Sequence, residues 1–377
     1  MISALQAGDL SSDGAVEKDQ SSGKFGDKFV DPEDGRFDLS KVLDEPLGFV
    51  PLIIPITEPA LGGGAAVVPV FIDQPDGGGR PNIAGAGVLR TSNDTEGAFG
   101  FYSGYFLDQK LHLNAGAGDM SINLDFYGVG SGLRPDGQPF QYNLDTTFGM
   151  FGAEWKLGES NWNLGLRYAY AEIAASLANP LLPPGGNPFW GNGIEYVVSS
   201  LRPTLLYDSR DNIFTPTTGV VSELSVTANL EGLGGDSNNQ VVKWANFWFH
   251  PLVDDCLFLG VKAEVEQSFG NLPFYMRPYV NLRGAPAARY QGDGVVSAEA
   301  ELRWQLHPRW SLVGFAGFGA TWFDDHPWKS GVTTATGGVG FRYLMARRHG
   351  LHMGLDVAFG EEGSAVYVQF GSAWNRF

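Results

Sequence analysis

The side chains that could carry chemistry in this sequence are charged groups in two short stretches. Asp208, Arg210 and Asp211 lie in the first, which ends at Gly219. Such a cluster could act on a partner, but a charged turn that only orders its own backbone has the same composition. The second stretch is Leu-Arg-Gly around Arg283. Neither stretch has a Ser/His/acid spacing of the kind that would indicate a hydrolase.

The rest of the chain does not predict an enzyme. His326 lies beside Asp324 and Asp325, but these residues fall in an acidic, loop-like stretch, so we expect no metal site. The glycines form no phosphate-binding loop between a strand and a helix. Cys256 is the single cysteine and cannot form an intramolecular disulfide. We expect no catalysis and no cofactor.

Composition narrows the class of protein further. The chain has 377 residues, of which 18% are charged, and no apolar run approaches the ~18 residues that a membrane helix requires. The formal net charge of -17 argues against nucleic-acid binding. A β-barrel distributes its apolar residues on alternate positions, so its average hydropathy is modest. These values exclude a helical membrane protein and are consistent with a barrel.

Alternation along the chain predicts strands. In residues 257–268 and 295–306 apolar residues alternate with charged or polar ones. This period of two is typical of a strand with one apolar face. The apolar face of Trp310–Trp322 carries a tryptophan at each end, as expected for two aromatic girdles. Short turns alternate with long Gly/Pro/Asn-rich loops, which is the pattern of an outer-membrane barrel. We count about sixteen antiparallel strands.

Two regions follow from this pattern. Residues 1–46 are polar, acidic and without periodicity, and we predict a disordered periplasmic tail. We predict a transmembrane β-barrel over residues 47–377. Pro51, Pro55 and Pro59 cannot donate to a ladder, so the first strand should lie at an edge or seam.

Three motifs, in order, resemble the bacterial surface antigen superfamily, which includes the BamA and TamA assembly proteins and the two-partner-secretion transporters. The motifs are Tyr207-Asp-Ser-Arg-Asp-Asn with Pro216 and Gly219; Leu282-Arg283-Gly284; and Glu299-Ala-Glu301-Leu-Arg303-Trp304. The first falls in the fourth short turn and the second in the sixth long loop. The chain end also resembles the closing strand of this family, with Phe370, Gly371, Trp374 and Phe377 as its signal residues.

The resemblance implies that the sixth extracellular loop folds into the lumen. Arg283 would then contact inward residues, with Glu301 as the best-matched partner and Glu299 on the same polar face. An arginine that is partly shielded from water needs such a carboxylate. The chain departs from the family pattern at Ala285, where an aromatic is common, and at Gly317, where many members carry a second inward acid.

The resemblance also implies a function. We expect a barrel of the bacterial outer membrane, in a Gram-negative cell, that contacts outer-membrane lipid and lipopolysaccharide. The tail is too short for a periplasmic POTRA domain, so a short member of the family is expected. Such a barrel would assist the insertion or translocation of a protein or lipid with a separate periplasmic or secreted client. A passive pore and a structural surface scaffold remain as alternatives.

Overall fold

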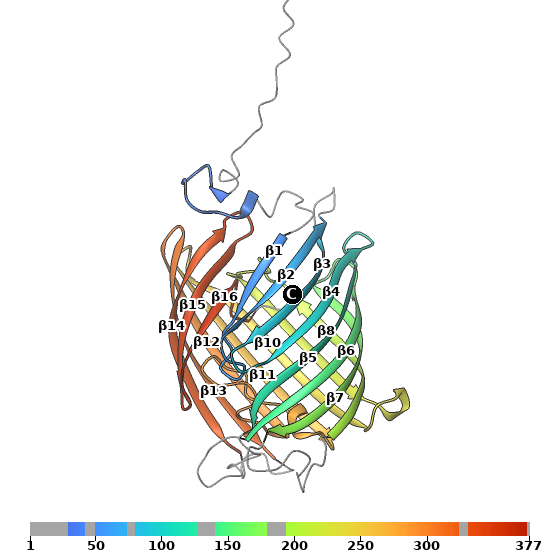
Figure 1. Ribbon diagram of the computed structural model, residues 1–377. Helices are drawn as coiled ribbons and strands as arrows, with labels where there is room; N and C mark the ends of the chain where they lie inside the picture. The colour runs from blue at the N-terminus through green and yellow to red at the C-terminus, as the bar shows by residue number, and fades with distance from the viewer. Residues whose placement is uncertain are drawn as a thin grey trace, which may run out of the picture.

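The structure is a computed structural model that describes residues 29–41, 50–73, 80–126, 140–178, 194–323 and 331–374. Within these residues sixteen strands form a single antiparallel sheet in the order β1 to β16, which curls into a barrel (Figure 1). The all-β barrel of about sixteen strands predicted from the sequence is confirmed. No helix in the described ranges is long and apolar enough to cross a membrane.

The described strands are seven to 17 residues long, and the short 3-10 helices η2 and η3 accompany them. The bounds are β1 Val50–Ile56, β2 Gly64–Asp73, β3 Asn82–Thr91, β4 Glu96–Phe106, β5 Leu111–Phe126, β6 Phe140–Lys156, β7 Trp162–Ala178, β8 Ile194–Asp208, β9 Gly219–Asn229, η2 Glu231–Leu233, β10 Asn239–Val253, β11 Leu257–Gly270, η3 Phe274–Met276, β12 Gly294–His307, β13 Trp310–Trp322, β14 Thr333–Ala346, β15 Leu351–Gly360 and β16 Gly363–Phe370.

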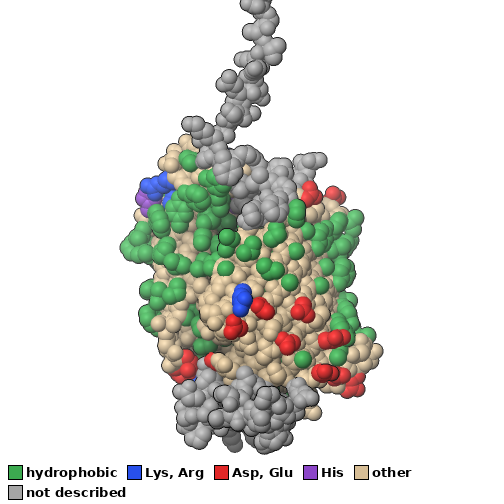
Figure 2. Space-filling view, in the orientation of Figure 1, with side chains coloured by type: hydrophobic (Ala, Val, Ile, Leu, Met, Phe, Trp, Pro, Cys, Tyr) green, Lys and Arg blue, Asp and Glu red, His purple; other side chains and the backbone are tan. Residues whose placement is uncertain are grey.

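The wall of the barrel has an apolar outer face and a polar inner face. On β12, Leu302 and Trp304 are exposed on the outside, whereas the alternate residues Glu299 and Arg303 are buried. This is the reverse of a soluble protein, and it suits a wall that faces lipid. Figure 2 shows apolar side chains gathered over the upper part of one face and acidic side chains toward its lower end.

β1 and β16 meet at a seam. Each of the other strands pairs with both of its neighbours in sequence, but in the described residues no backbone ladder joins β1 to β16. A side-chain contact crosses the gap instead, from the Val368 amide to Thr57 Oγ1 at 3.3 Å. The proline-rich first strand therefore lies at the edge where the sequence predicted it.

The β10–β11, β12–β13 and β14–β15 turns lie at one end of the barrel, which we call the periplasmic end as the sequence predicts, and β-bulges interrupt the strands beside these turns. The ladders shift between Gln305 and His307 on β12, and between Leu344 and Ala346 on β14. A bulge leaves a residue out of the ladder. The carbonyl of the bulged Met345 accepts instead from the amide of Leu39, at 2.7 Å.

The prediction of a disordered tail over residues 1–46 is wrong for residues 29–41. This segment docks on the periplasmic rim above β14 and β15 (Figure 1). Asp31, Asp34 and Asp38 surround the guanidinium of Arg309 in the β12–β13 turn, with Asp38 Oδ2 at 2.5 Å from Arg309 Nη1. This segment is poor in apolar residues, and carboxylates hold it in place instead. We call residues 29–41 the acidic clamp.

Candidate functional site

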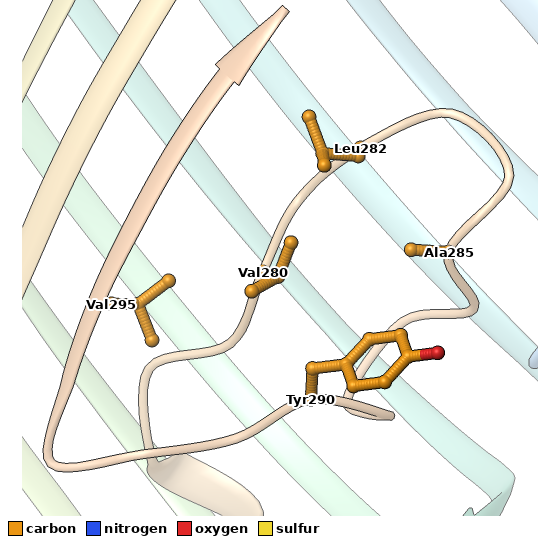
Figure 3. Close-up of a cluster of buried hydrophobic side chains, with 5 residues drawn as sticks. All are labelled: Val280, Leu282, Ala285, Tyr290 and Val295. Atoms are coloured by element: carbon orange, nitrogen blue, oxygen red, sulfur yellow. The ribbon is translucent and has the colours of Figure 1, made fainter. Parts of the chain in front are cut away.

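The candidate site is built on the loop between β11 and β12, the sixth extracellular loop. Its residues Val280, Leu282, Ala285 and Tyr290 are buried in a cluster with Val295 of β12 (Figure 3). The amide of Val280 donates to the carbonyl of Tyr290 at 2.9 Å, so the loop closes on itself. This packing fixes the backbone from which Arg283 projects.

Arg283 lies among inner-face carboxylates of two strands. Its Nη2 lies 2.8 Å from Glu299 Oε1, and its Nη1 lies 2.7 Å both from Glu301 Oε2 and from Asp356 Oδ2. Glu299 Oε2 also accepts from the Arg283 amide at 3.2 Å. Asp356 accepts a hydrogen bond from Nη1, while the Glu301 contact is an ion pair without hydrogen-bond geometry. The structure therefore brings together Arg283, Glu299 and Glu301, and it adds Asp356 of β15.

Two more arginines lie in this part of the barrel. Arg342 of β14 holds Asp356 with two nitrogens and lies 3.7 Å from Glu301 Oε2. Arg303 is buried, and its guanidinium lies over the Phe258 ring. Buried charges are tolerated when each has an opposite partner and hydrogen bonds. The network can therefore hold a loop in place.

Two aromatic rings cover the Arg283 guanidinium. Phe315 of β13 lies 3.6 Å from it, centroid to carbon, and Trp374 lies 6.0 Å away. Trp374 Nε1 donates to Glu299 Oε1 at 2.7 Å, and its ring packs near Phe249. Cation–π contacts of this kind gain strength where water is excluded.

The predicted C-terminal strand signal needs a correction. β16 ends at Phe370, and the chain turns at Gly371, where φ is +75°. Trp374 thus belongs to no strand and lies against the inner-face network, because it finds an acceptor and apolar neighbours there. Phe377 lies outside the described residues.

The loop tip also reaches both sides of the seam. The Gly284 amide donates to the Tyr367 hydroxyl of β16 at 3.0 Å. Glu58, in the β1–β2 turn, accepts from the Ala287 amide at 3.0 Å. Burial raises the pKa of Glu58, although hydrogen bonds from the backbone act against that rise. The sixth loop therefore bridges β16 and the β1–β2 turn.

Gly317 leaves little room for a side chain. A Cβ at this position would lie 2.9 Å from the Leu282 side chain, so the loop approaches the wall closely here. Asp356, on a strand two positions further along, supplies the carboxylate. The period of two on β15 could have identified it, since His352, Asp356 and Ala358 are all buried.

The charged turn between β8 and β9 orders its own backbone. Arg210 donates to both carboxylate oxygens of Asp208, at 3.0 and 2.8 Å. Asp211 accepts from the amides of Thr217 and Thr218, at 3.0 and 3.1 Å. The sequence left open whether this turn acts on a partner or only orders its own backbone. These contacts account for the ordering of the backbone.

The same turn lies against other periplasmic segments. Asn212 Nδ2 donates to the carbonyl of His349 in the β14–β15 turn at 2.9 Å. The Ser372 amide donates to the carbonyl of Phe214 at 2.6 Å. The turn thus joins the chain end and a turn 137 residues away in sequence.

The other half of the barrel encloses a polar cavity of about 640 Å³. Its wall carries both signs of charge. Arg167 of β7 and Arg202 of β8 both line the cavity and are opposite each other in the ladder. Arg202 pairs with Glu223 at 2.8 Å. No group of His, Cys, Asp and Glu suited to a metal occurs in the described ranges, and His326 lies outside them.

Comparison with known proteins identifies the fold. The model of the Omp85 superfamily domain matches residues 78–359. No curated protein sequence gives a match. BamA from Haemophilus ducreyi lacking POTRA domains 1-3 superposes with a TM-score of 0.56 at 14% identity, over 91% of this chain and 80% of that one.

Two structures of CdiB have the same fold. The protein from Acinetobacter baumannii gives a TM-score of 0.58 at 10% identity, over 85% of this chain and 59% of that one. The protein from Escherichia coli gives 0.57 at 14% identity, over 85% of this chain and 61% of that one. This chain therefore spans less than two thirds of the length of either CdiB structure.

Proposed function

Because the chain belongs to the Omp85 superfamily, whose barrels assemble or translocate proteins at the bacterial outer membrane, we propose that it moves a protein client through an opening of the β1–β16 seam. The family resemblance and the outer-membrane location predicted from the sequence are confirmed. We propose in addition that the protein has a protein client, that a separate partner takes part, and that the seam opens.

The unpaired seam is the observation that carries the proposal. Fifteen consecutive strand pairs have backbone ladders, and β1 to β16 has none in the described residues. An unpaired strand edge in lipid is costly, so the resting seam needs contacts that cover it. The contacts across it are single ones, such as Val368 to Thr57. They are weaker than a ladder and can be exchanged for pairing with a client strand.

The sixth loop supplies the latch in this proposal. Through Gly284 it holds Tyr367 of β16, and through Ala287 it holds Glu58 beside β1. Its own position depends on Arg283 and the buried carboxylates. A movement of the loop would therefore release both sides of the seam together. Client capture would fall to a separate periplasmic partner.

A disulfide across the seam tests the proposal. Thr57→Cys with Val368→Cys, in a Cys256→Ser background, would lock β1 to β16. Val357→Cys with Val366→Cys is the matched control, because these residues already face each other on β15 and β16. The assay is the folding rate of a urea-unfolded eight-stranded barrel added to vesicles that contain the protein.

We expect faster folding with the unlocked protein and with the control, and loss of the acceleration in the seam-locked protein until reductant is added. Equal acceleration by locked and unlocked protein would contradict the seam mechanism. The alternative of a passive pore is favoured only by the polar cavity of about 640 Å³. A steady conductance in planar bilayers that locking leaves unchanged would support that alternative.

A further inference from the structure

The acidic clamp reaches the lipid-facing side of the barrel. The carbonyl of Phe37 accepts a hydrogen bond from the Tyr343 hydroxyl at 2.7 Å. Tyr343 lies on the outer face of β14, and the Trp310 ring of β13 lies 4.9 Å from its own, centroid to centroid. Tyrosine and tryptophan concentrate where a membrane meets water. Phe37 is therefore attached to the aromatic girdle at the periplasmic edge of the wall.

The clamp presents apolar side chains at this place. The rings of Phe29 and Phe37 stack with centroids 6.2 Å apart and planes within 9°. Phe37 is 48% exposed and Val30 is 39% exposed. Among the described residues these side chains stay partly exposed, and they lie beside the apolar outer surface of β13 and β14. In water they would be a liability, whereas at a bilayer surface they would be buried.

A cation accompanies the apolar side chains. Arg36 is exposed, and its Nη1 lies 3.3 Å from His307 Nδ1. The neighbouring acids are occupied elsewhere, since Asp34 and Asp38 hold Arg309 and Glu33 lies 2.6 Å from Arg347. Figure 2 shows basic side chains beside apolar ones at the upper left rim, where Figure 1 draws the clamp. A phosphate group is the complement of such a cation.

We propose that the acidic clamp is a lipid-binding element, in which Phe37, Val30 and Phe29 enter the periplasmic leaflet of the outer membrane while Arg36 binds a phospholipid phosphate. The three aspartates fix the clamp to Arg309, so its apolar side chains are presented without further folding. Continuity with the girdle favours lipid over a protein as the occupant. Lipid binding by the clamp requires only the outer-membrane location and does not depend on opening of the β1–β16 seam.

Depth measurements at two positions test the insertion. The full chain, with Cys256→Ser, carries a spin label at Phe37→Cys or at Glu33→Cys and is reconstituted in phosphatidylcholine vesicles with phosphatidylglycerol. Glu33 is the matched control, because it lies on the same segment with its side chain 70% exposed and paired to Arg347. We expect the label at residue 37 to be relaxed by oxygen, and the label at residue 33 by a water-soluble nickel chelate.

Retained lipid tests the phosphate contact with the aromatic residues intact. Arg36→Gln should lower severalfold the phosphatidylglycerol that remains bound in native mass spectra of detergent-extracted protein. Arg90→Gln is the control, since Arg90 is an exposed arginine at the opposite end of the barrel, paired with Asp94. Heat-modifiable migration of each variant would show that the barrel has folded.

Two results would overturn the proposal. One is equal relaxation of the labels at residues 37 and 33 by the water-soluble nickel chelate, whatever the mobility of the two labels. The other is unchanged lipid retention in Arg36→Gln. A clamp whose occupant is a soluble protein would give the first result in vesicles that contain no such protein.

Discussion

Arg283 and Asp356 are 73 residues apart in sequence, and their side chains meet at 2.7 Å. Asp356 is fully buried and serves Arg283 and Arg342 at once. The sixth loop leads into β12, and the contact with Asp356 ties it to β15, which is three strands further along the sheet.

Asp356→Asn should destabilise the docked loop more than Glu301→Gln. The asparagine would leave two buried arginines short of a negative charge, and breaking a buried pair in this way costs about 3–5 kcal/mol. Glu301 makes ion pairs without a hydrogen bond and its side chain is 13% exposed, so its loss should cost less. The measurement is the urea midpoint of heat-modifiable migration. The reverse order of the two midpoints would refute this account of the network.

Arg309→Gln should release the acidic clamp while the barrel stays folded. Arg309 is the common partner of three aspartates, and its side chain is 1% exposed. Trypsin should then cleave after Arg36 much faster than in the parent protein. Arg347→Gln is the control, because the Arg347 side chain is 45% exposed and an exposed ion pair contributes roughly 0–1 kcal/mol. Similar cleavage of both variants would show that Arg309 is not the anchor.

Clamp docking should persist to moderately acidic pH and fail only in strong acid. Burial would raise the pKa of Asp38, but hydrogen bonds from Ser40 and Arg309 outweigh it and lower the pKa from 3.8 to about 2. A lowered pKa contributes stability that is complete above the unfolded value and is lost as pH falls toward the folded value. Docking should thus be stable at pH 5 and weaken between pH 3.8 and about 2.

A spin label at Pro32→Cys would report the release as a gain in mobility. In the Arg309→Gln background the label should be mobile at every pH. A transition centred near neutral pH would point to a histidine instead of Asp38.

Gly219→Ala should destabilise the β8–β9 turn. Gly219 has φ of +106°, and a Cβ there would lie 2.3 Å from the Ser209 carbonyl oxygen. Strained backbone of this kind costs about 1–3 kcal/mol before the steric clash is added. Gly232→Ala is the control, because a Cβ at Gly232 would meet nothing within 4 Å. Thermal midpoints in detergent would compare the two, and equal values would contradict the strain argument.

The sequence predicted the features that depend on local pattern. The period of two gave the strands and placed Glu299 and Glu301 on the polar face, where the structure finds both beside Arg283. Asp356 carried the same signal on β15, but its contact with a loop 73 residues away depends on how the sheet closes.

The clamp and Trp374 were missed for another reason. The tail lacks apolar periodicity, but Asp31, Asp34 and Asp38 need only one buried arginine to order the segment that carries them. Trp374 follows β16 directly, and no local signal marks that it leaves the sheet. Both segments are positioned by partners that are remote in sequence.

The placement of the clamp has a consequence for the order of events during folding. Asp38 binds Arg309 across 271 residues, and Leu39 binds the carbonyl of Met345. These partners acquire their positions only after β12 to β15 have paired. The first described segment to leave the ribosome is therefore among the last to be fixed. A chain in which these hairpins have not yet formed would leave the three aspartates without Arg309 in position to bind them.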